Sequence, residues 1–147
     1  MKIHHIERSV LLPYAVADMF ELVSDVDSYQ EFVPWCQKSE VIESTDEYVV
    51  GTLQVQYAGL TERIVTKNIL EPYEKIEMNL LQGPFAQFTG EWRFLDLGIG
   101  SKATLDLSFD VHKHVLISLA SRFIEKSVEK ILHSFVRRAQ SQLVECE

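Results

Sequence analysis

The hydrophobic pattern changes once along the chain, from alternation over most of its length to a helical spacing near the C-terminus. Between Val115 and Leu143, apolar residues recur at steps of three and four, and no proline or glycine interrupts them. This spacing places them on one face of a helix roughly 40 Å long at about 1.5 Å per residue. The apolar face consists of Leu116, Leu119, Ala120, Phe123, Ile124, Val128, Ile131, Leu132, Phe135, Val136, Ala139 and Leu143. So wide a stripe needs a partner, which we expect to be a sheet.

Alternation of apolar and polar residues between Ser39 and Val111 predicts a series of short strands. The pattern is clearest from Leu105 to Val111, and turn signals such as Gly83-Pro84 separate the runs. With a first strand at Ile3–Leu12, we expect about seven strands. Turn-length connections favour antiparallel pairing, because parallel strands need long crossovers. Gly90 in the middle of one strand predicts a bend or the close approach of another element.

Two short helical segments follow the first strand. Ala15–Ser24 has apolar residues at helical spacing, and Asp25–Tyr29 ends it with room for one more turn. We expect Asp25 and Asp27 to cap helix ends. The predicted fold class is therefore α+β, with a bent antiparallel sheet of about seven strands around a long C-terminal helix. The 147 residues are expected to form one domain, 1–147, with a sizeable core.

Composition and charge narrow the classes of function. Apolar residues make up 46% of the chain and charged residues 24%, which is typical of globular proteins. The formal net charge of −8 argues against general binding to DNA, which depends on neutralising phosphates. No apolar run approaches the length of a membrane span, and Met1–Leu12 carries too many polar residues for a signal peptide. We therefore expect a cytoplasmic protein.

Residues with catalytic or metal-binding chemistry are present but form no specific motif. Cys36 and Cys146 are far apart, so no disulfide framework follows from them. His112 and His114 supply at most half a zinc site, and a solvated junction between strand and helix is the simpler interpretation. Asp106 alternates with core residues and is expected to face water, as is Asp110. We predict no catalytic residue and no metal site.

Large aromatic residues are abundant, and two groups of them lie in predicted turns, Phe32–Trp35 and Gly83–Phe85. Most aromatic residues belong to cores, but a bent sheet facing one helix tends to leave an apolar space near its open edge. Turn residues of this kind suit the rim of such a cavity. Strand parity and helix phase predict that it is lined or gated by Phe32, Trp35, Val55, Met78, Leu80, Phe85, Trp92, Phe109, Leu116 and Phe123.

A row of basic residues follows the polar face of the predicted C-terminal helix. The row is formed by Arg122, Lys126, Lys130, His133 and Arg137, at steps of four, four, three and four. A solvated face is the simpler interpretation. The functional alternative is contact with phosphates, either of lipid head groups at a membrane surface or of ribosomal RNA. In a chain of net charge −8, this row is the natural place for such contact.

Five short motifs occur in a fixed order along the chain. They are Asp25-Val26-Asp27-Ser28-Tyr29, Glu31-Phe32-Val33-Pro34-Trp35-Cys36, Gly83-Pro84-Phe85, Gly90-Glu91-Trp92-Arg93-Phe94 and Phe135-Val136-Arg137-Arg138-Ala139. Together they resemble the motifs of the coenzyme Q-binding, START-like family of small bacterial and mitochondrial proteins. The bacterial branch is also described as a ribosome association toxin, within the polyketide cyclase and lipid transport superfamily. The chain departs from the family pattern at Gln30, where the family has proline.

The resemblance implies a helix-grip fold with a hydrophobic cavity between the sheet and the long helix. It further implies binding of a polyisoprenoid lipid such as ubiquinone by a carrier or chaperone that requires no cofactor. Such a carrier would serve respiration or quinone biosynthesis, with transient contact at the inner membrane. The alternative is binding to the large ribosomal subunit to block subunit association. A polyketide cyclase ranks third, because few polar groups are predicted to face inward.

Overall fold

Seven antiparallel strands form one sheet in the order β1-β7-β6-β5-β4-β3-β2. The computed structural model describes residues 3–57, 60–111 and 117–147, with side chains for 3–56, 61–110 and 126–147. The elements are β1 (His4–Leu12), α1 (Val16–Ser24), the 3₁₀ helix η1 (Val26–Glu31), β2 (Cys36–Ser44), β3 (Tyr48–Tyr57), β4 (Leu60–Glu71), β5 (Lys75–Gln82), β6 (Phe85–Asp96), β7 (Ser101–Val111) and α2 (Ile117–Gln142).

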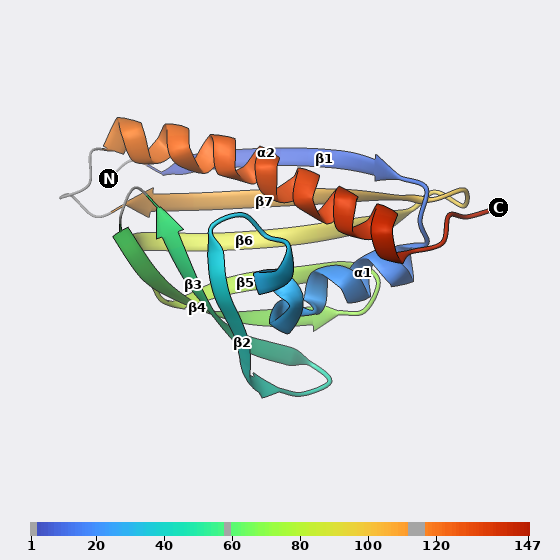
Figure 1. Cartoon of the computed structure of the whole chain (residues 1–147), viewed down its shortest axis with the longest axis horizontal. Coiled ribbons are helices and arrows are strands. Elements are labelled where there is room, and N and C mark those ends of the chain that lie inside the picture. Colours follow the sequence, from blue (N-terminus) through green and yellow to red (C-terminus); the bar gives the residue numbers. More distant parts are fainter. Residues whose placement is uncertain (1–2, 58–59, 112–116) are drawn as a thin grey trace.

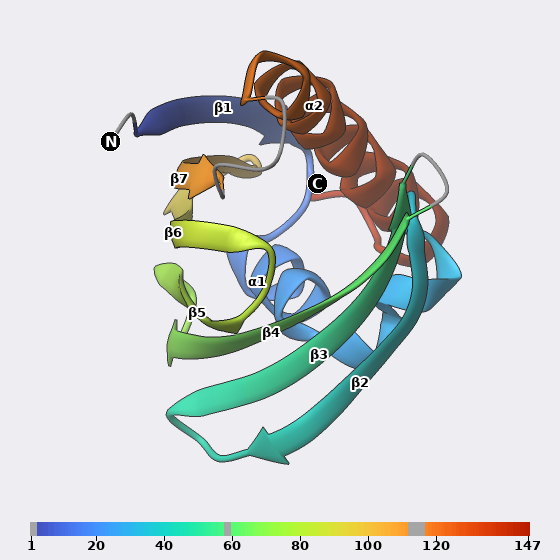
Figure 2. The ribbon, with the colours of Figure 1, turned by 90° about the vertical axis from the view of Figure 1, so that its left-hand side faces the viewer.

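The sheet bends into an arc that holds both α-helices on its concave side (Figure 2). Helix α2 runs obliquely across this side, while α1 and η1 lie between it and the far strands (Figure 1). Strands β2 to β7 lie side by side in the order of the sequence, and β1 pairs with β7 to form the other edge of the sheet. The predicted fold class is confirmed. None of the described helices has a stretch long and apolar enough to cross a membrane.

Irregularities in strand pairing accompany the bend. The register shifts twice between β2 and β3, and once between β4 and β5 beside Val65 and Thr66. Such bulges bend a strand and increase its twist. At Gly90, an added Cβ would lie 2.6 Å from Met78 Cε and 2.7 Å from Leu107 Cδ2. The predicted close approach at this glycine is therefore confirmed.

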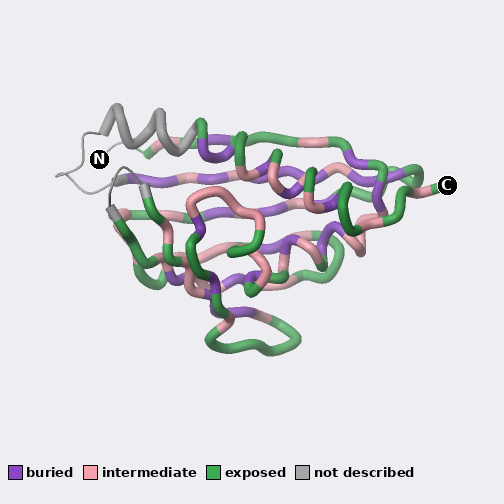
Figure 3. The backbone as a smooth tube through the Cα atoms, viewed as in Figure 1, coloured by how far each residue is buried: buried purple, intermediate pink, exposed green. Residues whose placement is uncertain are grey.

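The core follows the predicted helical phase. On α2, Val128, Leu132, Phe135 and Ala139 are buried at steps of four, three and four. They pack in one cluster with the buried face of α1 and with inward residues of β1, β5, β6 and β7. Figure 3 shows the opposite face of α2 and the β2–β3 hairpin tip exposed. This packing fixes α2 over the concave side of the sheet.

The aspartate predictions were only partly right. Asp25 occupies the C-cap of α1 and the N-cap of η1, as predicted, but its side chain bonds no backbone amide and accepts from Ser28 Oγ at 2.6 Å. Asp27 Oδ1 accepts from the Val41 amide at 2.7 Å, so it joins η1 to β2. Asp110 is only 8% exposed. It lies beside a register shift in the β6–β7 pair, where simple alternation no longer fixes exposure.

Candidate functional site

An apolar cavity of about 260 Å³ lies between the concave face of the sheet and α2. Its walls come from η1, the segment that joins η1 to β2, six strands and α2. None of the described lining residues carries a formal charge at neutral pH. They are Val26, Tyr29, Val33, Pro34, Trp35, Cys36, Gly51, Leu53, Val55, Ile64, Thr66, Asn68, Met78, Phe85, Phe88, Trp92, Leu105, Leu107, Ser127, Val128, Ile131 and Phe135.

Five of the predicted lining residues meet at this cavity: Trp35, Val55, Met78, Phe85 and Trp92. They come from the segment before β2 and from β3, β5 and β6, so residues up to 57 positions apart converge on one space. Their contact with a ligand stays a prediction. Two other predicted residues cannot be placed, since Leu116 and the side chain of Phe123 lie outside the described part of the chain.

Three predicted lining residues lie elsewhere. The ring of Phe32 packs edge-on against Phe135 at 5.1 Å and faces a groove on the outer side of α2. Leu80 pairs with Thr66, but β5 and β6 no longer pair at this point, and Leu80 borders a separate hollow. Phe109 is 1% exposed and packs behind Phe85 at 6.2 Å. Alternation along a strand predicts which face of the sheet a side chain lies on, but it does not predict whether that side chain reaches the cavity or packs behind another residue.

Polar lining residues were missed by the sequence analysis. Tyr29, Asn68 and Ser127 all border the cavity. The Tyr29 hydroxyl donates to the Val23 carbonyl, and burial, followed by the charge of Asp25, raises the pKa of Tyr29 well above its usual range. Ser127 lies on α2 outside the predicted apolar stripe, whereas the other described lining residues of this helix, Val128, Ile131 and Phe135, belong to that stripe.

Trp35 lines the cavity with an unusual backbone conformation. Its φ of 64° lies in the left-handed region that residues with a side chain rarely adopt. The Trp35 carbonyl accepts from the Gln56 amide at 2.9 Å, which ties the segment to β3. Lys130 Nζ lies 5.4 Å from the centre of the Trp35 ring, within range of a cation–π contact. Strained residues of this kind cluster at functional sites.

A basic groove of about 700 Å³ runs along the outer side of α2. Lys126, Lys130, His133 and Arg137 of the predicted row line it, whereas the side chain of Arg122 is outside the described residues. Further lining comes from Phe32, Pro34, Glu129, Ser134, Arg138 and Ser141. Arg138 is partly neutralised by Glu31 at 3.1 Å. Pro34 borders both the basic groove and the apolar cavity.

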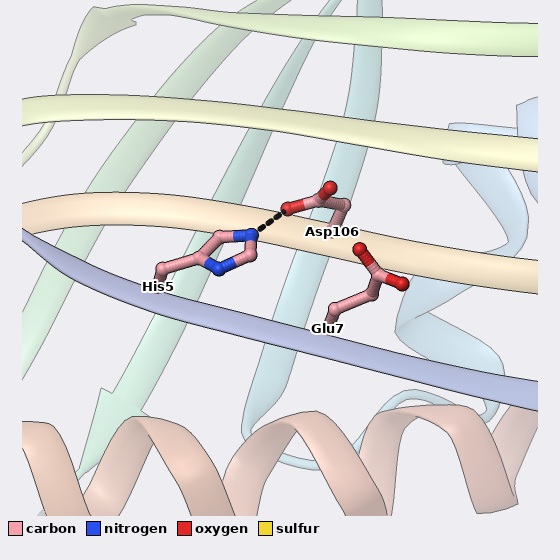
Figure 4. A group of neighbouring side chains, drawn as sticks. All are labelled: His5, Glu7 and Asp106. Carbon is pink, nitrogen blue, oxygen red and sulfur yellow. Dashed lines mark hydrogen bonds and ion pairs between the residues drawn. The ribbon is translucent and has the colours of Figure 1, made fainter.

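A third group of titratable side chains lies on the convex face of the sheet (Figure 4). His5 Nε2 donates to Asp106 Oδ1 at 2.6 Å, and Glu7 lies close enough for the three to share a metal ion. Arg93, however, is 3.1 Å from Asp106 and 3.4 Å from Glu7, so its guanidinium already supplies the balancing positive charge. The group is best described as an ion-pair network. Residues on three strands meet here, which spacing within one segment cannot indicate.

Comparison with known proteins identifies the family. The family model described as polyketide cyclase / dehydrase and lipid transport matches residues 12–136. The ribosome association toxin RatA of Pseudomonas aeruginosa is 39% identical over 137 residues, which are 92% of this chain and 95% of the relative. The mitochondrial coenzyme Q-binding protein COQ10 homolog B of Xenopus laevis is 28% identical over 136 residues, 89% of this chain and 56% of that one.

A solved structure supports the same grouping at the level of the fold. The Zhui aromatase/cyclase from Streptomyces sp. R1128 superposes with a TM-score of 0.87 and covers 97% of this chain and 100% of its own. Its sequence identity of 20% shows the shared fold alone. The resemblance noted in the sequence is thus confirmed by both kinds of comparison. This chain belongs to the polyketide cyclase / dehydrase and lipid transport family, with a START-like fold.

Proposed function

We propose that this protein binds an isoprenoid lipid, such as ubiquinone, in the cavity beneath α2 and carries it without transforming it. The observation that carries the proposal is the cavity itself, whose described lining is apolar and uncharged. Each buried methylene gains about 0.8 kcal/mol, so such a lining favours hydrocarbon strongly over water. The name of the Xenopus laevis relative, a coenzyme Q-binding protein, supports a quinone as the ligand.

The size of the cavity limits what it holds at one time. Its volume of about 260 Å³ lies just below the usual range of small-molecule sites, roughly 300–1,000 Å³. The space therefore fits a ring or a few isoprene units, and the rest of a long tail extends beyond it. Solved structures with this fold include an aromatase/cyclase, but we propose carriage because the described lining offers no charged acid or base.

The test is organic extraction of protein purified from a quinone-producing bacterium, followed by mass spectrometry of the extract. We expect near-stoichiometric isoprenoid quinone with the parent and little with Ile64→Trp, which fills the cavity from β4. Arg63→Trp is the matched control, because neighbouring strand residues point to opposite faces. A folded parent that stays empty after incubation with quinone would exclude the proposal.

A second candidate function is binding to the large ribosomal subunit through the basic groove. The specific observation is the line of Lys126, Lys130 and Arg137 on one side of α2, in a protein whose net charge is −8. Phosphate contacts of this kind depend on local positive charge and weaken as salt rises. The name of the Pseudomonas aeruginosa relative, ribosome association toxin, supports this candidate.

Co-sedimentation with ribosomal subunits over a series of salt concentrations tests the second candidate. We expect the double variant Lys126→Glu with Arg137→Glu to lose binding, and the parent to lose it as salt rises. Lys130 is left unchanged because it also contacts Trp35 at the cavity. Lys38→Glu with Arg63→Glu, on the convex side of β2 and β4, makes the same change in net charge. Equal loss in both double variants would exclude the groove as the binding surface.

A further inference from the structure

Asn68 is the one buried polar side chain whose oxygen lacks a partner among the described residues. It lies on β4, is 7% exposed and borders the apolar cavity. Its Oδ1 has no hydrogen-bond partner. An unsatisfied buried acceptor costs about 1–3 kcal/mol, and buried polar atoms of folded proteins almost always have a partner, whether protein, ordered water or ligand. No other side-chain atom of the described chain shares this state.

Strand register places Asn68 and Trp35 toward opposite ends of the cavity. Trp35 lies at the end of the cavity where Cys36 pairs with Val55, and Val55 pairs with Glu62 on β4. Asn68 is six residues beyond Glu62, or about 20 Å at roughly 3.3 Å per strand residue. Between the two ends, the concave face of β3 and β4 is mainly aliphatic, with Leu53 and Ile64 paired across it.

Two other polar groups of the cavity already have partners. The Tyr29 hydroxyl donates to the Val23 carbonyl, and the Cys36 thiol donates to the Lys38 carbonyl at 3.5 Å. Among the described cavity residues, Asn68 carries the one fully buried polar atom without a partner, so a ligand group that pairs with it removes that cost. Because its free atom is a carbonyl oxygen, the complementary group on the ligand is a hydrogen-bond donor.

We propose that the ligand carries a hydroxyl group and that Asn68 Oδ1 accepts its hydrogen bond. The inference rests on the proposed lipid-binding function and narrows it to a ligand class. Two isoprenoid sources carry such a group: the reduced, quinol form of a quinone and a free prenol. An oxidised quinone offers only acceptors on its ring, so it leaves Asn68 Oδ1 without a hydrogen-bond donor.

The experiment measures dissociation constants for two pairs of probes that differ in the donor. One pair is farnesol and farnesyl methyl ether; the other is ubiquinol-1 and ubiquinone-1, kept reduced or oxidised under anaerobic conditions. We expect the parent to bind farnesol about tenfold more tightly than farnesyl methyl ether, or ubiquinol-1 about tenfold more tightly than ubiquinone-1, or both. One buried hydrogen bond predicts a difference of this size. Preference confined to the quinol pair identifies a quinone ring, and preference confined to farnesol identifies a prenol.

Asn68→Leu is the informative variant, because leucine keeps the volume and removes the acceptor. We expect it to bind both members of each pair with equal affinity and to melt at a higher temperature than the parent. Asn79→Leu, one residue beyond Met78 on β5, is the control for the same chemical change outside the cavity lining. It should keep the donor preference.

The outcomes separate the two proposals. If the parent binds none of the four probes, the lipid-binding function fails and the Asn68 proposal fails with it. If the parent binds them but lacks a donor preference, or if Asn68→Leu keeps that preference, lipid binding stands and the role of Asn68 is overturned. A preference that the parent shows and Asn68→Leu loses supports the proposal.

Discussion

At the scale of single residues, Cys36 offers a reporter inside the cavity. Its side chain is 8% exposed, and burial raises the pKa of its thiol, with hydrogen bonds at Lys38 and Ser39 opposing the shift in part. The thiolate is the reactive form, so a raised pKa and poor access both slow alkylation. We predict that Cys36 reacts with iodoacetamide at pH 8 at least about tenfold more slowly than Cys146, which is partly exposed.

Mass spectrometry of the labelled peptides over time measures both rates in one sample. Because Cys36 lines the cavity, bound lipid should slow its labelling further and leave the rate at Cys146 unchanged. Cys146 is thus the internal control for unfolding and for reagent quality. If saturating lipid slows both cysteines equally, or neither, the ligand does not occupy the space beside Cys36.

The ion-pair network on the convex face predicts a dependence of stability on pH. Burial alone would raise the pKa of Asp106, but hydrogen bonds from Arg93 and His5 outweigh it and hold the pKa below its ordinary value of 3.8. The unfolded state therefore takes up a proton before the folded state as pH falls. The stabilisation from Asp106 is complete above that ordinary value and is lost as pH falls through the lower, folded value.

Urea unfolding of the parent and of Asp106→Asn measures how much the charge of Asp106 contributes to the free energy of unfolding. At pH 7 we expect the variant to be less stable by about 1 kcal/mol, because the amide keeps the shape but loses the charge. The difference should shrink as pH falls below 3.8. A gap of constant size down to pH 2.5 would mean that the charge of Asp106 contributes nothing through Arg93.

At the scale of elements, Gly100 packs closely against the end of β1. It lies in the turn between β6 and β7, where an added Cβ would lie 2.2 Å from the Leu12 carbonyl oxygen and 3.1 Å from Pro13 Cα. Both are backbone atoms, so the turn or the end of β1 must move. We predict that Gly100→Ala costs about 3 kcal/mol and lowers the melting temperature by about 10 °C.

Gly90→Ala is the matched comparison for that prediction. Its added Cβ would meet only the far ends of the Met78 and Leu107 side chains, which can turn aside. We therefore expect a cost of about 1 kcal/mol, measured by the same thermal melt. If the two variants have the same melting temperature, the backbone contact at Gly100 does not cause a larger loss of stability than the side-chain contacts at Gly90.

Elements were more predictable from the sequence than the site was. The strands and α2 follow from alternation and helical spacing, since burial of one face imposes those periods on any sequence. Parity placed Trp92 and Phe109 on the same face of neighbouring strands, yet only Trp92 reaches the cavity, because depth depends on the rings packed in front. Asn68 gave no signal at all, since a polar residue in a strand ordinarily indicates the wet face.

At the scale of the whole molecule, the apolar cavity and the basic groove are separate surfaces that meet at one wall. Pro34 borders both, and Lys130 of the groove lies over the Trp35 ring of the cavity. Elsewhere their residues differ, with strands supplying most of the cavity and the outer side of α2 supplying the groove. This layout allows one fold to present both proposed binding surfaces.

The same layout predicts that the two binding activities can be removed one at a time. Ile64 lines only the cavity, and Lys126 and Arg137 line only the groove. We expect Ile64→Trp to lose extractable lipid while its co-sedimentation with ribosomal subunits changes by less than about twofold, a difference below 0.5 kcal/mol. Lys126→Glu with Arg137→Glu should show the opposite pattern. If either variant loses both activities while its melting temperature is unchanged, the two surfaces are coupled, and Pro34 is the residue that they share. If that variant is Ile64→Trp, lipid binding controls binding to the ribosomal subunit.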